Sequence, residues 1–156
     1  MKKLFYLFLL LPFTMFISCN DDKDFSPVDM TVTLSGVTEV NDVFYTVAGE
    51  NVTIDNLTVK AIDGKSTDLA NVQFSLDNAP IFPVPGSDTM ASFSTNNLPA
   101  GTYSINAAGN LLQVDSPIKI FAVSYKLKVV ESLEDLPDNA PEIATYSQTI
   151  RINNSK

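Results

Sequence analysis

Apolar and polar residues alternate with a period of two through most of this sequence, and Gly, Asn, Asp or Pro separates the alternating runs. In the run 28–34 every even-numbered residue is apolar, and the residues between them are Asp or Thr. Successive side chains of a β-strand point to opposite faces, so such a run predicts a strand with one buried face. A helical pattern is confined to one turn near Ser132–Leu136. We expect an all-β sandwich of about seven to nine strands.

Local signals predict where these strands turn or change phase. Glycine favours turns, so we expect the chain to turn at Ser35–Gly36 and again at Asp63–Gly64. Between these turns, the inward-facing positions change from even to odd numbers at Asp55–Asn56. An extra residue in one strand of a pair produces such a change, so we expect a bulge or a bend there.

The longest β-rich run spans residues 117–130. Its apolar residues change phase, because Ile118 and Ile120 precede an odd-numbered series that begins at Val123. We expect both isoleucines to point inward and a second bulge near Phe121 to restore the alternation.

The segment Leu98–Tyr103, Leu-Pro-Ala-Gly-Thr-Tyr, places a tyrosine at the start of a late strand. It resembles the corner of bacterial Ig-like and carboxypeptidase-regulatory-like domains, in which the tyrosine hydroxyl bonds to upstream backbone. This resemblance implies a single Ig-like antiparallel β-sandwich, which we place at residues 28–152, with a frayed tail at 153–156. The alternative is a core tyrosine in an ordinary hairpin.

The first eighteen residues form a separate segment. A short cationic start, Met1–Lys3, precedes an unbroken apolar stretch, Leu4–Ile17. That stretch is shorter than the ~20 residues that span a bilayer comfortably. A charged start, a short apolar core and a small residue before a cut site predict a secretory signal peptide over residues 1–18. A core helix or a retained membrane helix is the alternative.

The segment Phe16–Cys19 resembles a bacterial lipobox, with Phe16 departing from the usual Leu. The resemblance implies cleavage between Ser18 and Cys19 and acylation of Cys19, which begins a spacer over residues 19–27. The next five residues resemble the acidic export signal of Bacteroidota-type surface lipoproteins: Asn20, Asp21, Asp22, Lys23 and Asp24. This implies an outer-membrane lipoprotein displayed on the cell surface. The alternatives are the periplasmic leaflet and a polar linker without a sorting role.

Composition excludes several classes of chemistry. The chain has no His and one Cys, so Ser-His-Asp and Cys-His catalysis, His or Cys zinc sites and an internal disulfide are excluded. We therefore expect no cofactor, no metal site and no catalytic residues. Without residues 1–18, 8 basic and 18 acidic residues remain, a net charge of about −10 that opposes nucleic-acid binding.

Three residues outside the anchor are candidate contact or modification sites. Phe82 lies between prolines in a segment that can be only an edge strand and a loop, where a sugar or a partner strand could bind. The alternative is an edge protected against aggregation. Tyr45 is a second candidate contact for a sugar. Asp88–Met90 resembles the O-glycan acceptor of exported Bacteroidota-type proteins, with Thr89 as the acceptor.

These observations favour a non-catalytic surface lipoprotein. Its domain would bind a glycan or protein ligand, as an accessory to glycan uptake or as an adhesin, with the membrane bound through Cys19. A structural subunit of a surface fibre, joined by strand addition, is the alternative. A small hydrolase that uses two carboxylates is the third hypothesis; most acidic residues follow turn signals, where Asp is favoured for structural reasons. The sequence leaves the oligomeric state open.

Overall fold

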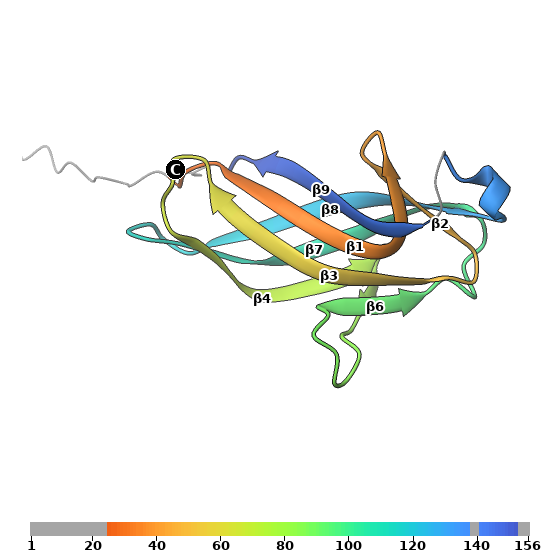
Figure 1. Ribbon diagram of the computed structural model, residues 1–156. Helices are drawn as coiled ribbons and strands as arrows, with labels where there is room; N and C mark the ends of the chain where they lie inside the picture. The colour runs from red at the N-terminus through yellow and green to blue at the C-terminus, as the bar shows by residue number, and fades with distance from the viewer. Residues whose placement is uncertain (1–24, 138–140, 153–156) are drawn as a thin grey trace, which may run out of the picture.

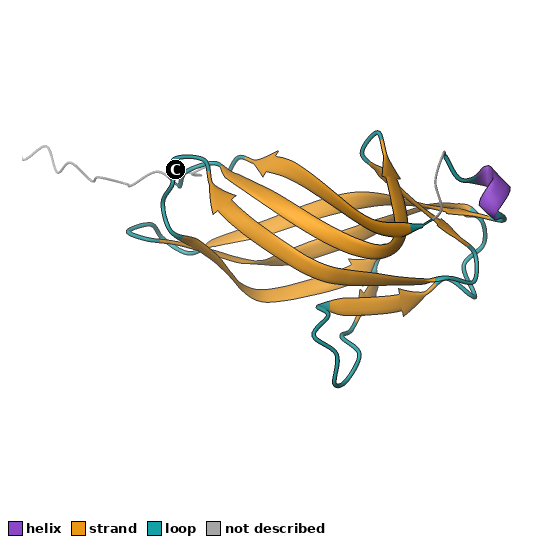
Figure 2. Cartoon of the chain, in the orientation of Figure 1, coloured by secondary structure: helices purple, strands orange, loops and turns teal. Residues whose placement is uncertain are grey.

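The computed structural model describes residues 25–137 and 141–152, and strands dominate that part of the chain (Figures 1 and 2). This confirms the prediction of an all-β protein. The described strands are β1 (Val28–Val40), β2 (Val43–Val47), β3 (Asn51–Ala61), β4 (Thr67–Leu76), β5 (Ala79–Ile81), β6 (Ala91–Ser94), β7 (Gly101–Gln113), β8 (Lys119–Val130) and β9 (Glu142–Ile150). One 3₁₀ turn, η1 (Leu133–Asp135), follows β8 where a single helical turn was expected.

The strands form one continuous path in the order β5-β4-β7-β8-β2-β1-β3-β6, with β9 beside β1. The pairs are antiparallel except β2–β8, which is parallel. The two ends of the path meet at a single bridge, in which the Ser92 amide donates to the Phe82 carbonyl at 3.1 Å. The described strands therefore form a nearly barrel-shaped sheet, and this topology does not confirm the finer expectation of a two-layer sandwich.

Strand β1 changes partners along its length, and Gly36 marks the change. Residues 28–37 pair with β9 and, up to Ser35, with β3, whereas residues 38–40 pair with β2. Gly36 has φ +79°, and a Cβ there would lie 2.1 Å from the Asn51 carbonyl oxygen. The predicted turn at Ser35–Gly36 is thus wrong: glycine provides a bulge inside a strand that continues.

The other two local signals are confirmed. Thr33 pairs with Asn56 and Leu34 pairs with Ile54, so Asp55 is the extra residue of a bulge in β3. A turn follows β3, where the Gly64 amide donates to the Ala61 carbonyl at 3.2 Å.

Two predictions for residues 117–130 are wrong. The β7–β8 pairing runs from Gly101↔Val129 to Leu111↔Lys119 without a register shift, so there is no bulge near Phe121. Phe121 itself points inward at 1% exposure, whereas Ile118 and Ile120 are 66% and 80% exposed. Because Phe121 points inward, the uninterrupted alternation of β8 turns Ile120 outward, and Ile118 lies in the loop before β8.

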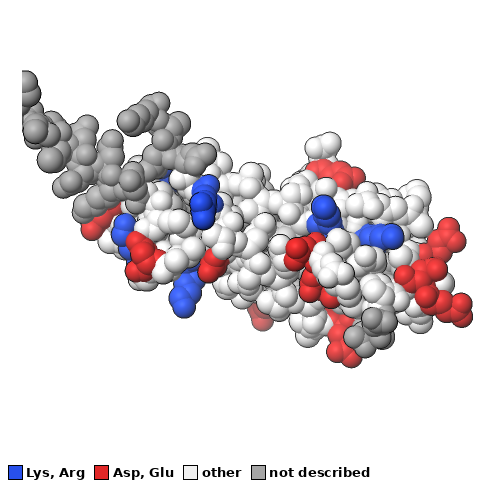
Figure 3. Space-filling view, turned by 90° about the horizontal axis from the view of Figure 1, so that it is seen from above, with Lys and Arg blue, Asp and Glu red and all other residues white. Residues whose placement is uncertain are grey.

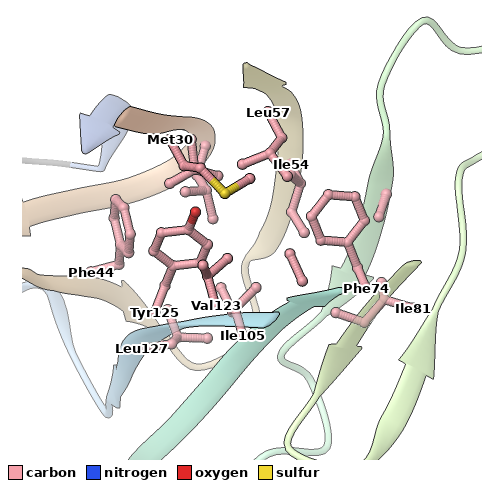
Figure 4. Packing of buried hydrophobic residues seen from close by; sticks show 14 of the residues in the cluster. Met30, Phe44, Ile54, Leu57, Phe74, Ile81, Ile105, Val123, Tyr125 and Leu127 are labelled. Atoms are coloured by element: carbon pink, nitrogen blue, oxygen red, sulfur yellow. The ribbon is translucent and has the colours of Figure 1, made fainter. Parts of the chain in front are cut away.

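A single apolar core fills the sheet (Figure 4). Phe44, Tyr125 and Tyr146 pack edge to face, with ring centroids 6.2–6.4 Å apart. Edge-to-face pairs add to the stabilisation from burial alone. The predicted inward faces of β1 and β7 belong to this core, including the fully buried Ile105.

The predicted hydrogen bond of the tyrosine corner is present. The Tyr103 hydroxyl donates to the Pro99 carbonyl at 2.7 Å, across the bend that leads into β7. Tyr103 also packs against the edge of the core. The bond therefore fixes the approach of the chain to β7.

Phe25, the first described residue, already packs against the domain, although it lies inside the segment 19–27 that we assigned to a spacer. Phe25 and Ser26 are 4% and 8% exposed. The Ser26 amide donates to Gln113 Oε1 at 3.0 Å, and the Ser26 hydroxyl donates to Asp63. The described chain thus starts against the β3–β4 loop and the end of β7, at the left end of the molecule in Figure 1.

Candidate functional site

An open groove of about 420 Å³ lies over β4, β5 and the loop 82–90. No charged residue is among those that line it. The lining residues are Val72, Gln73, Phe74, Ser75, Asn78, Pro80, Ile81, Phe82, Pro83, Met90, Asn106 and Ala108. Ligand sites in proteins have this size range and this mixture of apolar residues with a few polar groups.

The groove forms where the path of strands nearly closes, a region we call the seam (β5, β6 and the loop 82–90). Proline has no amide hydrogen and therefore cannot continue a hydrogen-bonded ladder. Pro80 lies within β5 opposite Ser75, and Pro83 and Pro85 follow the strand, which is three residues long. Beyond β5, the chain leaves the sheet in the loop at the bottom of Figure 1 and returns at β6. The proline-rich sequence thus leaves a gap in an otherwise continuous sheet.

Phe82 gives the seam an exposed aromatic ring. Its neighbour Ile81 points into the core at 8% exposure, whereas Phe82 is 69% exposed and Val84 is 49% exposed. An aromatic ring held beside a groove can stack on an apolar face of a ligand. The structure therefore places the predicted contact Phe82 in a setting suited to binding.

Hydrogen bonds fix the wall of the groove beside Asn106. The Asn106 side-chain amide donates to the Asp77 carbonyl at 2.7 Å. The Asp77 carboxylate accepts from the Ser104 amide at 2.8 Å, and the Asp77 amide donates to the Ser104 carbonyl at 2.7 Å. The β4–β5 turn is thus attached to β7, so the groove is preformed on this side.

Tyr45, the second predicted contact, lies outside this groove. It faces away from the core on β2, where the Lys128 ammonium lies 5.7 Å from the centroid of its ring. β8 and β7 separate β2 from β4 in the sheet. Tyr45 and Phe82 therefore do not form one site.

Thr89 lies in the loop 82–90, close in sequence to the rim of the groove. Its amide donates to Ser87 Oγ at 3.0 Å, and the hydroxyls of the two residues share a hydrogen bond. The predicted anchor residues Ser18, Cys19 and 20–24 lie outside the described residues.

The walls of the groove carry no local sequence signal. Gln73 and Asn106 occupy polar positions in alternating runs, and nothing local distinguishes them from solvent-facing residues. They approach each other because β4 pairs with β7, including Gln73↔Ala108 and Ser75↔Asn106. Proline spacing around Phe82 was the available signal, and it indicated one side of the groove.

The clearest shift in acidity lies in the core, away from the groove. Burial raises the pKa of the Tyr125 hydroxyl to about 12. The nearby Gln148 side chain opposes this rise, although the hydroxyl makes no hydrogen bond of normal geometry among the described residues; Figure 4 shows it pointing into the core. Tyr125 is therefore a structural residue.

The arrangement can bind a ligand non-covalently, through one exposed ring, an apolar floor and amide groups. Over residues 25–137 and 141–152, no group of three His, Cys, Asp or Glu residues is placed to hold a metal ion. The same residues contain no helix with the length and hydropathy of a bilayer span. Comparison of the sequence with known protein families and with curated proteins gives no match.

Proposed function

We propose that this protein is a surface lipoprotein whose β-domain binds a neutral glycan in the groove beside Phe82. The observation that carries the proposal is an exposed phenyl ring at the rim of an uncharged, partly apolar groove. Such a protein would act without catalysis, as an accessory to glycan uptake or as an adhesin.

The chemistry of the groove suits a saccharide. A sugar ring presents C–H groups on its faces and hydroxyls at its edges. Phe82 can stack on the former, while the side chains of Gln73, Asn78 and Asn106 can donate to and accept from the latter. The absence of charge in the lining favours a neutral ligand over a phosphorylated or acidic one.

Anchoring through Cys19 is the second part of the proposal. An apolar run too short to span a bilayer ends at the only cysteine, and an acidic segment follows. One acyl chain binds a membrane marginally, and additional chains on the cysteine would make the attachment stable. The acidic residues 20–24 would then direct the protein to the outer surface.

For the fold we propose an Ig-like arrangement. Three observations support it: β1 divides its pairing between two sets of strands, β2 runs parallel to β8, and Tyr103 bonds to Pro99. The tyrosine corner is a feature of Ig-like sandwiches.

The binding proposal is tested on an array of neutral and acidic oligosaccharides with the chain from residue 20 onward. We expect saturable binding to a neutral glycan and weaker binding of the same glycan by Phe82→Ala. Leu133→Ala removes a side chain of similar exposure at η1 and should bind like wild type. Binding to acidic glycans alone, or to none, would contradict the proposal.

The anchor is tested in cells by fatty-acid labelling. Cys19→Ala should abolish labelling and release the protein from membranes. Replacing Asp21, Asp22 and Asp24 with Ala should keep the label but remove sensitivity to protease added to whole cells. Membrane retention of an unlabelled Cys19→Ala protein would show that the anchor is elsewhere.

One observation favours strand addition as a second candidate function. Among the described strands, β9 pairs with β1 alone, so its other edge is open along Glu142–Ile150. An open edge can accept a strand from another chain. Sedimentation that shows a monomer at high protein concentration would argue against self-assembly of this kind. The hydrolase hypothesis finds no support in the groove, whose lining contains no carboxylate.

A further inference from the structure

The exposed large apolar side chains of the described residues are unevenly distributed. Some lie at the seam, at η1 and at the start of β9. The others lie at the end of the molecule that contains Phe25, the first described residue. We call this group the tether face: Ile62, Val114, Ile118 and Ile120, which are 57–80% exposed. Single exposed apolar residues are normal on a protein surface, whereas a group of four at one end can mark an interaction site.

Hydrogen bonds hold the loops of the tether face side by side. The Val114 amide donates to the Ser66 carbonyl at 3.2 Å, which joins the β7–β8 loop to the β3–β4 loop. The Ile62 amide donates to the Pro27 carbonyl at 3.0 Å, next to the start of the described chain. These bonds place the β3–β4 and β7–β8 loops beside each other, and the described chain starts next to them.

Charge differs between the two ends of the molecule. Near the tether face, four basic residues accompany four acidic ones: Lys60, Lys65, Lys119, Arg151, Asp29, Asp63, Asp68 and Asp115. The opposite end exposes Glu131, Glu134 and Asp135 around η1, and Figure 3 shows acidic side chains gathered there. An anionic surface would repel the η1 end and leave the tether face free to approach.

The length of the linker limits the position of the tether face. Residues 20–24 separate Cys19 from Phe25. At no more than ~3.6 Å per residue, Phe25 lies within about 22 Å of an acylated Cys19. A membrane anchor at Cys19 therefore keeps the tether face close to lipid headgroups.

We propose that the tether face rests on the lipid bilayer, with Val114 and Ile118 inserted among the headgroups and the η1 end pointing away. The inference rests on the proposed acylation of Cys19. It also orients the domain, because contact between the tether face and lipid leaves the seam clear of the membrane. Shallow apolar insertion of this kind adds to the binding provided by acyl chains.

The test uses the mature lipidated protein in vesicles of phosphatidylethanolamine and phosphatidylglycerol. Since Cys19 is the sole cysteine and its sulfur would carry lipid, Val114→Cys supplies a unique thiol for an environment-sensitive dye. Leu133→Cys, at a site of similar exposure on η1, is the matched control. A nitroxide on the lipid acyl chains should quench most of the emission at 114 and leave that at 133 nearly unchanged.

Three results would overturn the proposal. Equal quenching at 114 and 133 would mean that the domain has no fixed orientation. Shielding of the 114 dye without vesicles would mean that residues 20–24 or a second copy covers the tether face. If the protein neither floats with vesicles nor incorporates fatty acid, the proposed acylation of Cys19 is wrong. Flotation therefore distinguishes this outcome from the two quenching outcomes. In addition, Ile118→Asp with Ile120→Asp should float normally but lose quenching at 114.

Discussion

The aromatic cluster and the seam use aromatic side chains in opposite ways. Phe44, Tyr125 and Tyr146 pack against one another inside the sheet. There, the second half of β8 is paired with β7 on one side and with β2 on the other. At the seam a single bridge joins the sheet, and Phe82 lies at 69% exposure. Packing explains the first arrangement completely, whereas the second leaves apolar surface in water. The aromatic cluster therefore stabilises the fold, whereas the seam is the surface that we propose as the binding site.

The largest effect should follow from opening a cavity in the closed part of the sheet. Ile105 on β7 is fully buried, so Ile105→Ala should lower the free energy of unfolding by about 2–5 kcal/mol. Chemical denaturation would measure it. A loss below about 1 kcal/mol would mean that this part of the core packs loosely. The closed part of the sheet would then not be better packed than the seam.

The next effect depends on pH and belongs to Tyr125. Its pKa is raised to about 12 in the folded protein, above the value of 10.0 for the unfolded chain. The folded state thus favours the neutral hydroxyl. Its contribution to the free energy of unfolding is complete below pH 10 and is lost as the pH rises toward 12. The loss amounts to about 2–3 kcal/mol.

Tyr125→Phe checks this assignment. It should remove the alkaline loss and leave stability at neutral pH unchanged or slightly higher, because the hydroxyl has no partner among the described residues. Denaturation curves between pH 8 and about 12 would show the difference. An unchanged alkaline transition would assign it to another group.

A smaller effect is expected at the tyrosine corner. Tyr103→Phe removes the hydrogen bond to the Pro99 carbonyl and should cost about 0.5–1.5 kcal/mol. At neutral pH, Tyr103→Phe should therefore lower the free energy of unfolding, whereas Tyr125→Phe should leave it unchanged or raise it slightly. Equal losses at both positions would mean that the Tyr125 hydroxyl does find a partner.

The sequence predicted strands well where the signal was local. Alternation placed β1 and β7 with the correct face inward, and the change of phase at Asp55 located a bulge. Local signals failed where two outcomes share one pattern. Glycine at position 36 suits a turn or a bulge, and the choice depends on Asn51, which approaches from another strand.

Ile118 and Ile120 illustrate a second limit. Hydrophobicity predicted burial, yet strand phase set by Phe121 places Ile120 in solvent. The groove could not be predicted as a whole, since β4, β5 and β7 are brought together by pairings that no local pattern contains. Proline spacing indicated only the Phe82 side of the seam, and the tether face became visible only from the arrangement of strands.

The smallest stability effect and the most direct test concern Phe82. Since its ring is mostly in water, Phe82→Ala should change the free energy of unfolding by no more than about 0.5 kcal/mol. Calorimetric titration with a neutral oligosaccharide identified on the array should nevertheless show an affinity reduced by about two- to tenfold, equivalent to about 0.5–1.5 kcal/mol. Unchanged affinity in Phe82→Ala, with wild-type stability, would contradict the claim that the seam is the binding site.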